Sequence, residues 1–160
     1  MINNTEIAEL IIRAINKTEM INEYCNAEFK KSLILCVGTD IKNPPKGADV
    51  PFLFFEPIIK EISDTLPYYT YEFYSTLLIE GSDKPEIKKN VVRYNGIYQI
   101  ETLGDLICEA IKSEINCSNL ELIDCSFYHN QIDVFPIYSG TIVIKFAISN
   151  VIGDEKLILN

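Results

Sequence analysis

The most regular pattern in the chain is an alternation of side chains between Pro67 and Gly81. Alternate residues point to opposite sides of an extended strand, so a period of two that is rich in aromatic and β-branched residues predicts a long β-strand. Both sides of this strand carry apolar or aromatic residues, so we expect one side to cover a core and the other to meet a neighbour. One of these sides comprises Tyr69, Tyr71, Phe73, Ser75, Leu77 and Ile79.

Two other segments repeat apolar residues with the period of a helix. The first is Asn3–Ile15, whose start resembles a capping box because Glu6 follows Asn3 by one helical turn. The second runs from about Thr102 to Ile115 and also carries one apolar stripe. A further helix, of weaker periodicity, is expected from Thr18 to about Lys30.

Shorter apolar runs predict the remaining strands, and residues 51–81 together indicate an antiparallel meander. Before that meander, Gly38–Val50 contains two prolines and two glycines. This composition excludes a strand interior or a helix and predicts an extended loop or arm, which in a domain of this size is more often functional than idle. The expected strands are 32–37, 51–56, 57–63, 120–128, 132–138 and 140–149.

The dipeptide Asn95-Gly96 lies between two apolar runs, Val91–Tyr94 and Ile97–Ile100. Asn-Gly in this position is the strongest short signal for a tight β-hairpin, so we expect a small hairpin insertion within residues 82–100 that protrudes from the main sheet. Taken together, the elements predict a single α+β domain over residues 1–160. Its sheet is mostly antiparallel and is flanked by the N-terminal helix and by the helix near residues 102–115.

Length and charge narrow the classes of function. A chain of 160 residues can bury a substantial core as one domain. Its net charge of −9 argues against nucleic acid and anionic membranes as partners, because both attract basic surfaces. The cysteines are odd in number, at five, and none forms a Cys-x-x-Cys pair, so we expect reduced, buried thiols in a cytosolic protein. No apolar run is long enough to span a bilayer, and polar residues interrupt any leader-like start.

Candidate catalytic and metal-binding residues are few. His129 is the only histidine, and Cys125 lies an even number of positions before it, so a Cys–His dyad on one side of a strand is conceivable. A surface histidine beside a turn asparagine is the more ordinary interpretation. The acidic residues show no metal-ligand spacing, and the glycines match no phosphate-binding motif. We therefore expect neither an enzyme nor a bound cofactor or metal.

The tyrosines of the long strand allow two interpretations. They can be core residues and cross-strand pairs, or they can be interface anchors, because tyrosine is enriched where subunits meet. Under the second interpretation, they would act together with cations from the loop and the hairpin. The candidate contact residues for a second subunit or a tube are Lys42, Lys46, Tyr68, Tyr69, Tyr71, Tyr74 and Arg93.

The order of elements, with the run Asp49-Val50-Pro51-Phe52-Leu53-Phe54 ahead of the long strand, resembles the tail terminator (tail completion) proteins of tailed bacteriophages and phage-tail-like particles. The similar parts are Asn3–Ile15, Ala48–Glu80 and Thr102–Ser149, which cover most of the chain. The segment Ser82–Tyr98 is an elaboration on that pattern.

The resemblance implies a homo-hexameric ring that sits on the finished tail tube, stops its polymerisation and offers a docking surface to the head connector or the sheath end. The implied partners are further copies of the chain, the tail tube protein, and a sheath or head-connector protein. The implied location is a virion or phage-tail-like particle assembled in the bacterial host cytoplasm. The alternatives are another neck or head–tail joining protein, and a small-molecule-binding α/β domain.

Overall fold

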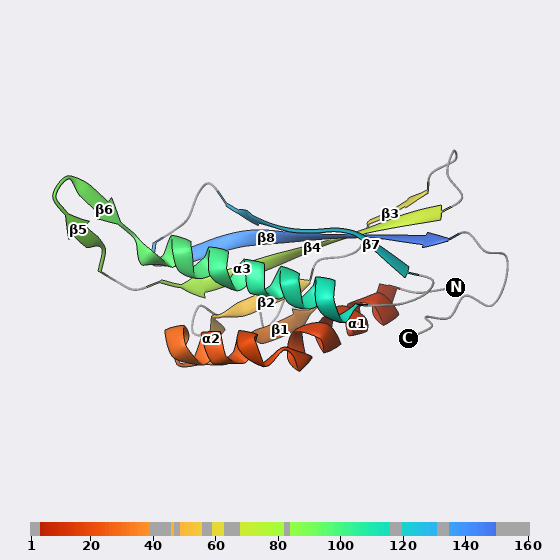
Figure 1. The fold of residues 1–160 in the computed structure, drawn as a ribbon, viewed down its shortest axis with the longest axis horizontal. Helices are drawn as coiled ribbons and strands as arrows, with labels where there is room; N and C mark the ends of the chain where they lie inside the picture. Colours follow the sequence, from red (N-terminus) through yellow and green to blue (C-terminus); the bar gives the residue numbers. More distant parts are fainter. Residues whose placement is uncertain are drawn as a thin grey trace.

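The computed structural model describes residues 4–38, 46, 49–55, 59–62, 68–81, 84–115, 120–130 and 135–149. Within them the chain forms three helices, one six-stranded sheet and a separate two-stranded hairpin (Figure 1). The sheet is mostly antiparallel, so the predicted α+β class is confirmed.

The helices are α1 (Asn4–Lys17), α2 (Glu19–Phe29) and α3 (Asn95–Glu114). The first two confirm the predicted helices, and the apolar stripe of α1 is buried as expected. The third helix begins well before the predicted start near Thr102 and ends where the pattern indicated.

The large sheet has the order β1-β2-β4-β8-β7, and β3 pairs with β4 beyond the end of β2. The strands β2 and β3 are both antiparallel to β4 and pair with successive parts of it, so they do not form the predicted meander, in which each strand would pair with the next one in sequence. In contrast, β1 and β2 are parallel. A parallel pair needs a long connection, and fourteen residues separate Val37 from Phe52; most of the predicted loop Gly38–Val50 lies outside the described residues. The strand bounds are β1 Ile34–Val37, β2 Phe52–Phe55, β3 Ile59–Ile62, β4 Tyr68–Glu80, β7 Leu120–His129 and β8 Ile137–Ser149.

The central pair of the sheet, β4 and β8, separates a covered side from an open side. On β4 the alternation predicted two sides without deciding which is covered, and the covered one is the side that is buried from Tyr71 to Ile79 at every second residue. All three helices lie on this side, below β4, β7 and β8 in Figure 1. Phe73 of β4 and Phe146 of β8 meet there edge to face, with ring centroids 6.0 Å apart. None of the described helices covers the opposite side.

The predicted turn at Asn95-Gly96 is wrong. These residues form the first turn of α3, and the hairpin lies just before it, as β5 (Glu86–Lys88) and β6 (Val91–Arg93). Its turn is Lys89-Asn90, with Lys89 at a positive φ of 55°. Gly96 is buried, and a Cβ atom there would lie 2.1 Å from Cε2 of Tyr138. Close packing against the sheet, not a turn, therefore explains this glycine.

Two aromatic rings of the sheet are each enclosed by a pair of glycines. A Cβ atom on either Gly81 or Gly96 would collide with Tyr138. A Cβ atom on Gly104 of α3 would lie 2.4 Å from Cγ and Cδ2 of Phe127, and one on Gly140 would also collide with that ring. The glycines therefore allow α3 to lie unusually close to β7 and β8.

This close approach predicts the effect of Gly104→Ala. Helix propensity alone would make the change stabilising by about 1 kcal/mol, because alanine is the better helix former. We expect the opposite, a loss of about 1–3 kcal/mol in the free energy of unfolding, because Cγ of Phe127 is anchored to its strand and cannot easily move away. Urea denaturation measures the difference.

The double variant Gly104→Ala/Phe127→Leu provides the control. The smaller leucine should leave room for the new methyl group, so the double variant should lose less stability than the sum of the two single variants. A stabilising Gly104→Ala, or strictly additive losses, would contradict the proposed contact.

Candidate subunit-interaction surfaces

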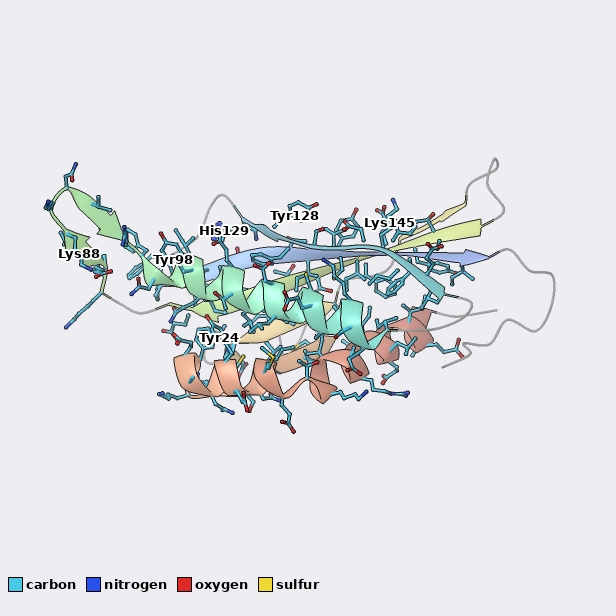
Figure 2. All side chains as sticks on the ribbon, in the orientation of Figure 1. Tyr24, Lys88, Tyr98, Tyr128, His129 and Lys145 are labelled. Carbon is cyan, nitrogen blue, oxygen red and sulfur yellow. The ribbon has the colours of Figure 1, made fainter. Side chains whose placement is uncertain are left out.

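The open side of the sheet is the first surface that the described part of the chain leaves exposed. The β4 residues that alternate with the buried ones are partly exposed, and the same is true of the facing residues of β8. Figure 2 shows Tyr128 and Lys145 on this side, away from the helices. The surface mixes aliphatic, aromatic and charged side chains, whereas the covered side of β4 carries no charged side chain from Tyr71 to Ile79. The partly exposed residues of β4 and β8 here are Glu72, Tyr74, Thr76, Leu78, Ser139, Thr141, Val143 and Lys145.

Three hydrogen-bonded polar side chains lie in the middle of this open side. Glu72 of β4 stands directly opposite Lys145 of β8, and the Lys145 ammonium donates a hydrogen bond to Glu72 Oε1. The Tyr74 hydroxyl donates to Glu72 Oε2 at 3.0 Å. The hydrogen bond from Lys145, followed by the one from Tyr74, lowers the pKa of the Glu72 carboxyl below its ordinary value of 4.5. The carboxylate is therefore ionised and held in place at neutral pH.

The structure separates the tyrosines that the sequence grouped together. Tyr71 is only 3% exposed and belongs to the core, so it is not available as an interface anchor. Tyr74 lies on the open side of the sheet. The backbones of Tyr68 and Tyr69 pair with Ser149 and Ile148 of β8, while their side chains lie outside the described residues.

The predicted cations lie on separate segments. Lys42 is outside the described residues. Lys46 is exposed and forms a tight turn in which its backbone N–H donates to Oδ2 of Asp49 at 2.8 Å. Arg93 is exposed at the end of β6, on the hairpin. Of the candidate residues whose side chains the structure describes, Tyr71 lies in the core, while Lys46, Tyr74 and Arg93 are exposed or partly exposed on three different segments.

The second uncovered surface is the hairpin, and residues 84–93 are called the basic arm here. The arm stands clear of the sheet at one end of the molecule, with Lys88 near its tip (Figures 1 and 2). Every residue from 86 to 93 is exposed. Ile87 and Val92 face each other across the two strands and are 67% and 52% exposed. One side of the arm is thus apolar, and the other carries most of its charges.

More exposed apolar residues adjoin the base of the arm. Tyr94, which joins the arm to α3, packs edge to face on Phe135, with ring centroids 5.8 Å apart. Ile97 and Tyr98 follow on the first turns of α3. Of the twelve large apolar side chains that are exposed in the described part of the chain, six fall within residues 87–98. Such a concentration is typical of a protein-contact site.

Sequence reasoning placed a hairpin in this region but missed its exposed apolar surface. The signal was present, because Ile87, Val91 and Val92 stand among lysines in a segment too short to bury them. The misplaced turn at Asn95-Gly96 concealed it, since that prediction assigned the apolar residues on both sides of the turn to paired strands.

The cysteine and histidine singled out from the sequence do not form a dyad. On β7 their spacing of four residues corresponds to about 13 Å along the strand. Cys125 is instead hydrogen-bonded to Cys108 of α3, and this bond together with burial raises the pKa of the Cys125 thiol far above its ordinary value. Burial raises the pKa of Cys25 to about 11. Both thiols are therefore protonated, and weakly nucleophilic, at neutral pH.

A surface depression of about 250 Å³ lies where the ends of α2 and β4 meet the start of α3. It is largely polar, and within it Gln99 Nε2 donates to Glu28 Oε2 at 2.9 Å. Small-molecule sites are usually more enclosed and more apolar. No three histidine, cysteine, aspartate or glutamate side chains of the described residues are grouped closely enough to hold a metal ion. None of the described helices is both long and apolar enough to cross a membrane.

When the chain was compared with models of known protein families, no family matched, and a search of curated proteins gave no match either. What the chain does must therefore be inferred from its own residues and from the order of its elements.

The lowered pKa of Glu72 predicts a pH-dependent effect of Glu72→Gln. A carboxyl with a lowered pKa stabilises the fold above its unfolded pKa of about 4.5, and this stabilisation is lost as the pH falls through the folded value. We expect the variant to lose about 0.5–1 kcal/mol at pH 7, because the pair is partly exposed. The loss should shrink towards zero in acid.

Urea denaturation at pH 7 and at pH 3 measures both values. Glu121→Gln is the matched control, because Glu121 is exposed on β7 and forms no recorded ion pair within the described residues. An equal loss at both pH values would argue against the ion pair as the cause.

The exposure of the arm predicts that its apolar residues contribute little to the stability of the single subunit. The variant Ile87→Ser/Val92→Ser should change the free energy of unfolding by less than about 0.5 kcal/mol in dilute solution. Ile142→Ser, the same type of change at a position that is 0% exposed, should cost about 2–5 kcal/mol. Comparable losses in the two variants would place the arm inside the core and contradict its description as a free surface.

Proposed function

We propose that this chain is a structural protein of a phage tail or phage-tail-like particle, where a ring of copies caps the tail tube. The ring, a hexamer by the family resemblance, ends tube polymerisation and gives the head connector or the sheath end a docking surface. The order of elements supports this proposal. The structural observation that supports it is the presence, on each subunit, of two different surfaces that the described residues leave exposed.

A ring of identical subunits needs this property. In a head-to-tail ring each subunit contacts its two neighbours through two different, complementary patches. The basic arm is small and partly apolar, whereas the open side of the sheet is broad and mixed in composition. A protein that worked as a monomer would gain nothing from keeping six large apolar side chains in water within residues 87–98.

The long central strands add a further argument. A strand of 13 residues spans about 43 Å, and the open side is exposed over residues 72–80 of β4 and 137–145 of β8, whereas Thr70 and Ala147 on the same side are buried. This gives a broad surface on which a tube or connector subunit can rest. The Glu72–Lys145 pair fixes a charge pattern in its centre and so restricts which partner fits.

The proposal predicts the outcome of a tube-assembly experiment. The purified chain should sediment as a multimer, and adding it to the polymerising tube protein of the same particle should give shorter tubes with a ring at one end. Negative-stain electron microscopy measures tube length and shows the ring. An unrelated acidic protein at equal concentration should leave the length distribution unchanged.

The other outcomes discriminate between functions. A strict monomer that never binds tubes would refute the proposal. Rings found at the head–tail joint without any effect on tube length would favour a neck or joining protein. A turnover that is lost in Cys125→Ser and His129→Ala variants would favour a small-molecule-binding domain.

A further inference from the structure

The basic arm differs in charge from the rest of the chain. Residues 84–93 hold four basic residues and one acidic residue, a net charge of +3, whereas the rest of the chain carries −12. Within the described residues, Lys88 is the one cation of the arm with an ion pair, which it makes with Glu86 of the arm itself. The arm therefore presents positive charge that an acidic surface can neutralise.

The arm also requires another element against which its apolar side can pack. A two-stranded hairpin is at best marginally stable in water unless it packs against another element. Each strand of the arm has only three residues, and its apolar pair Ile87 and Val92 is exposed. The described elements of the subunit do not cover the apolar pair, because the arm projects beyond the start of α3 at the end of the molecule (Figure 1). A surface that fits it must come from another molecule.

The helices α2 and α3 are both acidic, each with a net charge of −3. Between Asn95 and Glu114, α3 carries four acidic residues and one basic residue, and α2 carries three acidic residues and no basic one. In α1 two acidic residues are balanced by two basic ones, and the three acidic residues of α2 are followed directly by Lys30 and Lys31. Because Lys30 and Lys31 offset the charge of α2, α3 is the acidic helix on which a basic partner can dock.

The charges of α3 form one stripe on its solvent side. Glu101, Asp105 and Glu109 recur every fourth residue, which places them in line along the helix, and all three are exposed. None of the three forms a recorded ion pair within the described residues. Tyr98, which is 57% exposed, lies on the same side near the start of the helix and offers an apolar contact beside the charges. Glu101, Asp105 and Glu109 together are called the acidic stripe here.

We propose that the basic arm of one copy docks on the acidic stripe of α3 in the next copy. The lysines and Arg93 lie along Glu101, Asp105 and Glu109, while Ile87 and Val92 pack beside Tyr98. This assignment rests on the proposed ring and names the two patches that join its subunits. Because arm and stripe are different surfaces of one chain, each copy donates one arm and accepts another, which is the head-to-tail contact that a ring requires.

Charge reversal tests the pairing. The arm variant is Lys84→Glu/Lys89→Glu, and the stripe variant is Glu101→Lys/Asp105→Lys. Like charges then face each other in either variant, so each should associate at least tenfold more weakly than the parent in sedimentation measured at low salt. The variant that combines all four changes should recover the parental association, because the attraction is restored with its sign reversed.

Two further measurements sharpen this test. Mixing the arm variant with the stripe variant should restore association, since each now complements the other. Raising the ionic strength should weaken association of the parent, because exposed charges are screened within about 8–10 Å at moderate salt.

The matched control is Arg13→Glu/Lys30→Glu. It changes the net charge by the same amount as the arm variant, and Lys30 resembles Lys89 in having a positive φ, 59° against 55°. The control should associate like the parent. If the control loses association as the arm variant does, or if the four-fold variant stays dissociated while both double variants fold, the assignment is overturned.

The proposed function and the docking contact fail in different ways. A parent that forms rings unaffected by either reversal overturns the docking contact and leaves the tail function standing. A parent that assembles through arm and stripe but does not cap tubes overturns the tail function and leaves the docking contact standing. A parent that stays monomeric at all concentrations overturns both.

Discussion

The closeness of α3 to the sheet is the constraint on which the rest of this structure depends. Gly104 faces Phe127 and Gly96 faces Tyr138, with no room for a methyl group at either glycine. The helix can therefore cover β7, β8 and β4 directly, and α1 and α2 pack against it in turn. All the apolar cover is thereby gathered on one side of the sheet. The other side of the sheet remains exposed, and the arm projects from the N-terminal end of α3.

Parts of the fold could be predicted from sequence because their local period and their burial coincide. In β4 the alternating set from Tyr71 to Ile79 is the set that the core buries, and in α1 the apolar stripe faces the core. Such elements can be predicted without knowing which other elements pack against them. The same reasoning divided the tyrosines of β4 between two sides, and only the packing of the helices could decide that Tyr71 was the inner one and Tyr74 the outer one.

The predictions that failed depend on contacts distant in sequence. Asn95-Gly96 has the ideal local signature of a hairpin turn, but Tyr138 requires a glycine at position 96 and the helix starts there instead. The parallel pairing of β1 with β2 is likewise invisible in their short apolar runs. The candidate surface was missed for the same reason. Whether Ile87 and Val92 are buried depends on what packs over them, and nothing in the described part of their own chain does.

A single residue, Tyr94, joins the arm to α3. The aromatic side chain of Tyr94 packs on that of Phe135. This contact holds the connection between the arm and α3 in place, and so orients the arm relative to the helix that carries the acidic stripe. In a head-to-tail assembly, the angle between the donating patch and the accepting patch sets the rotation from one copy to the next, and this rotation decides between a closed ring and an open filament. In the proposed ring, the arm would supply the affinity, while the contact of Tyr94 with Phe135 would determine how many copies close it.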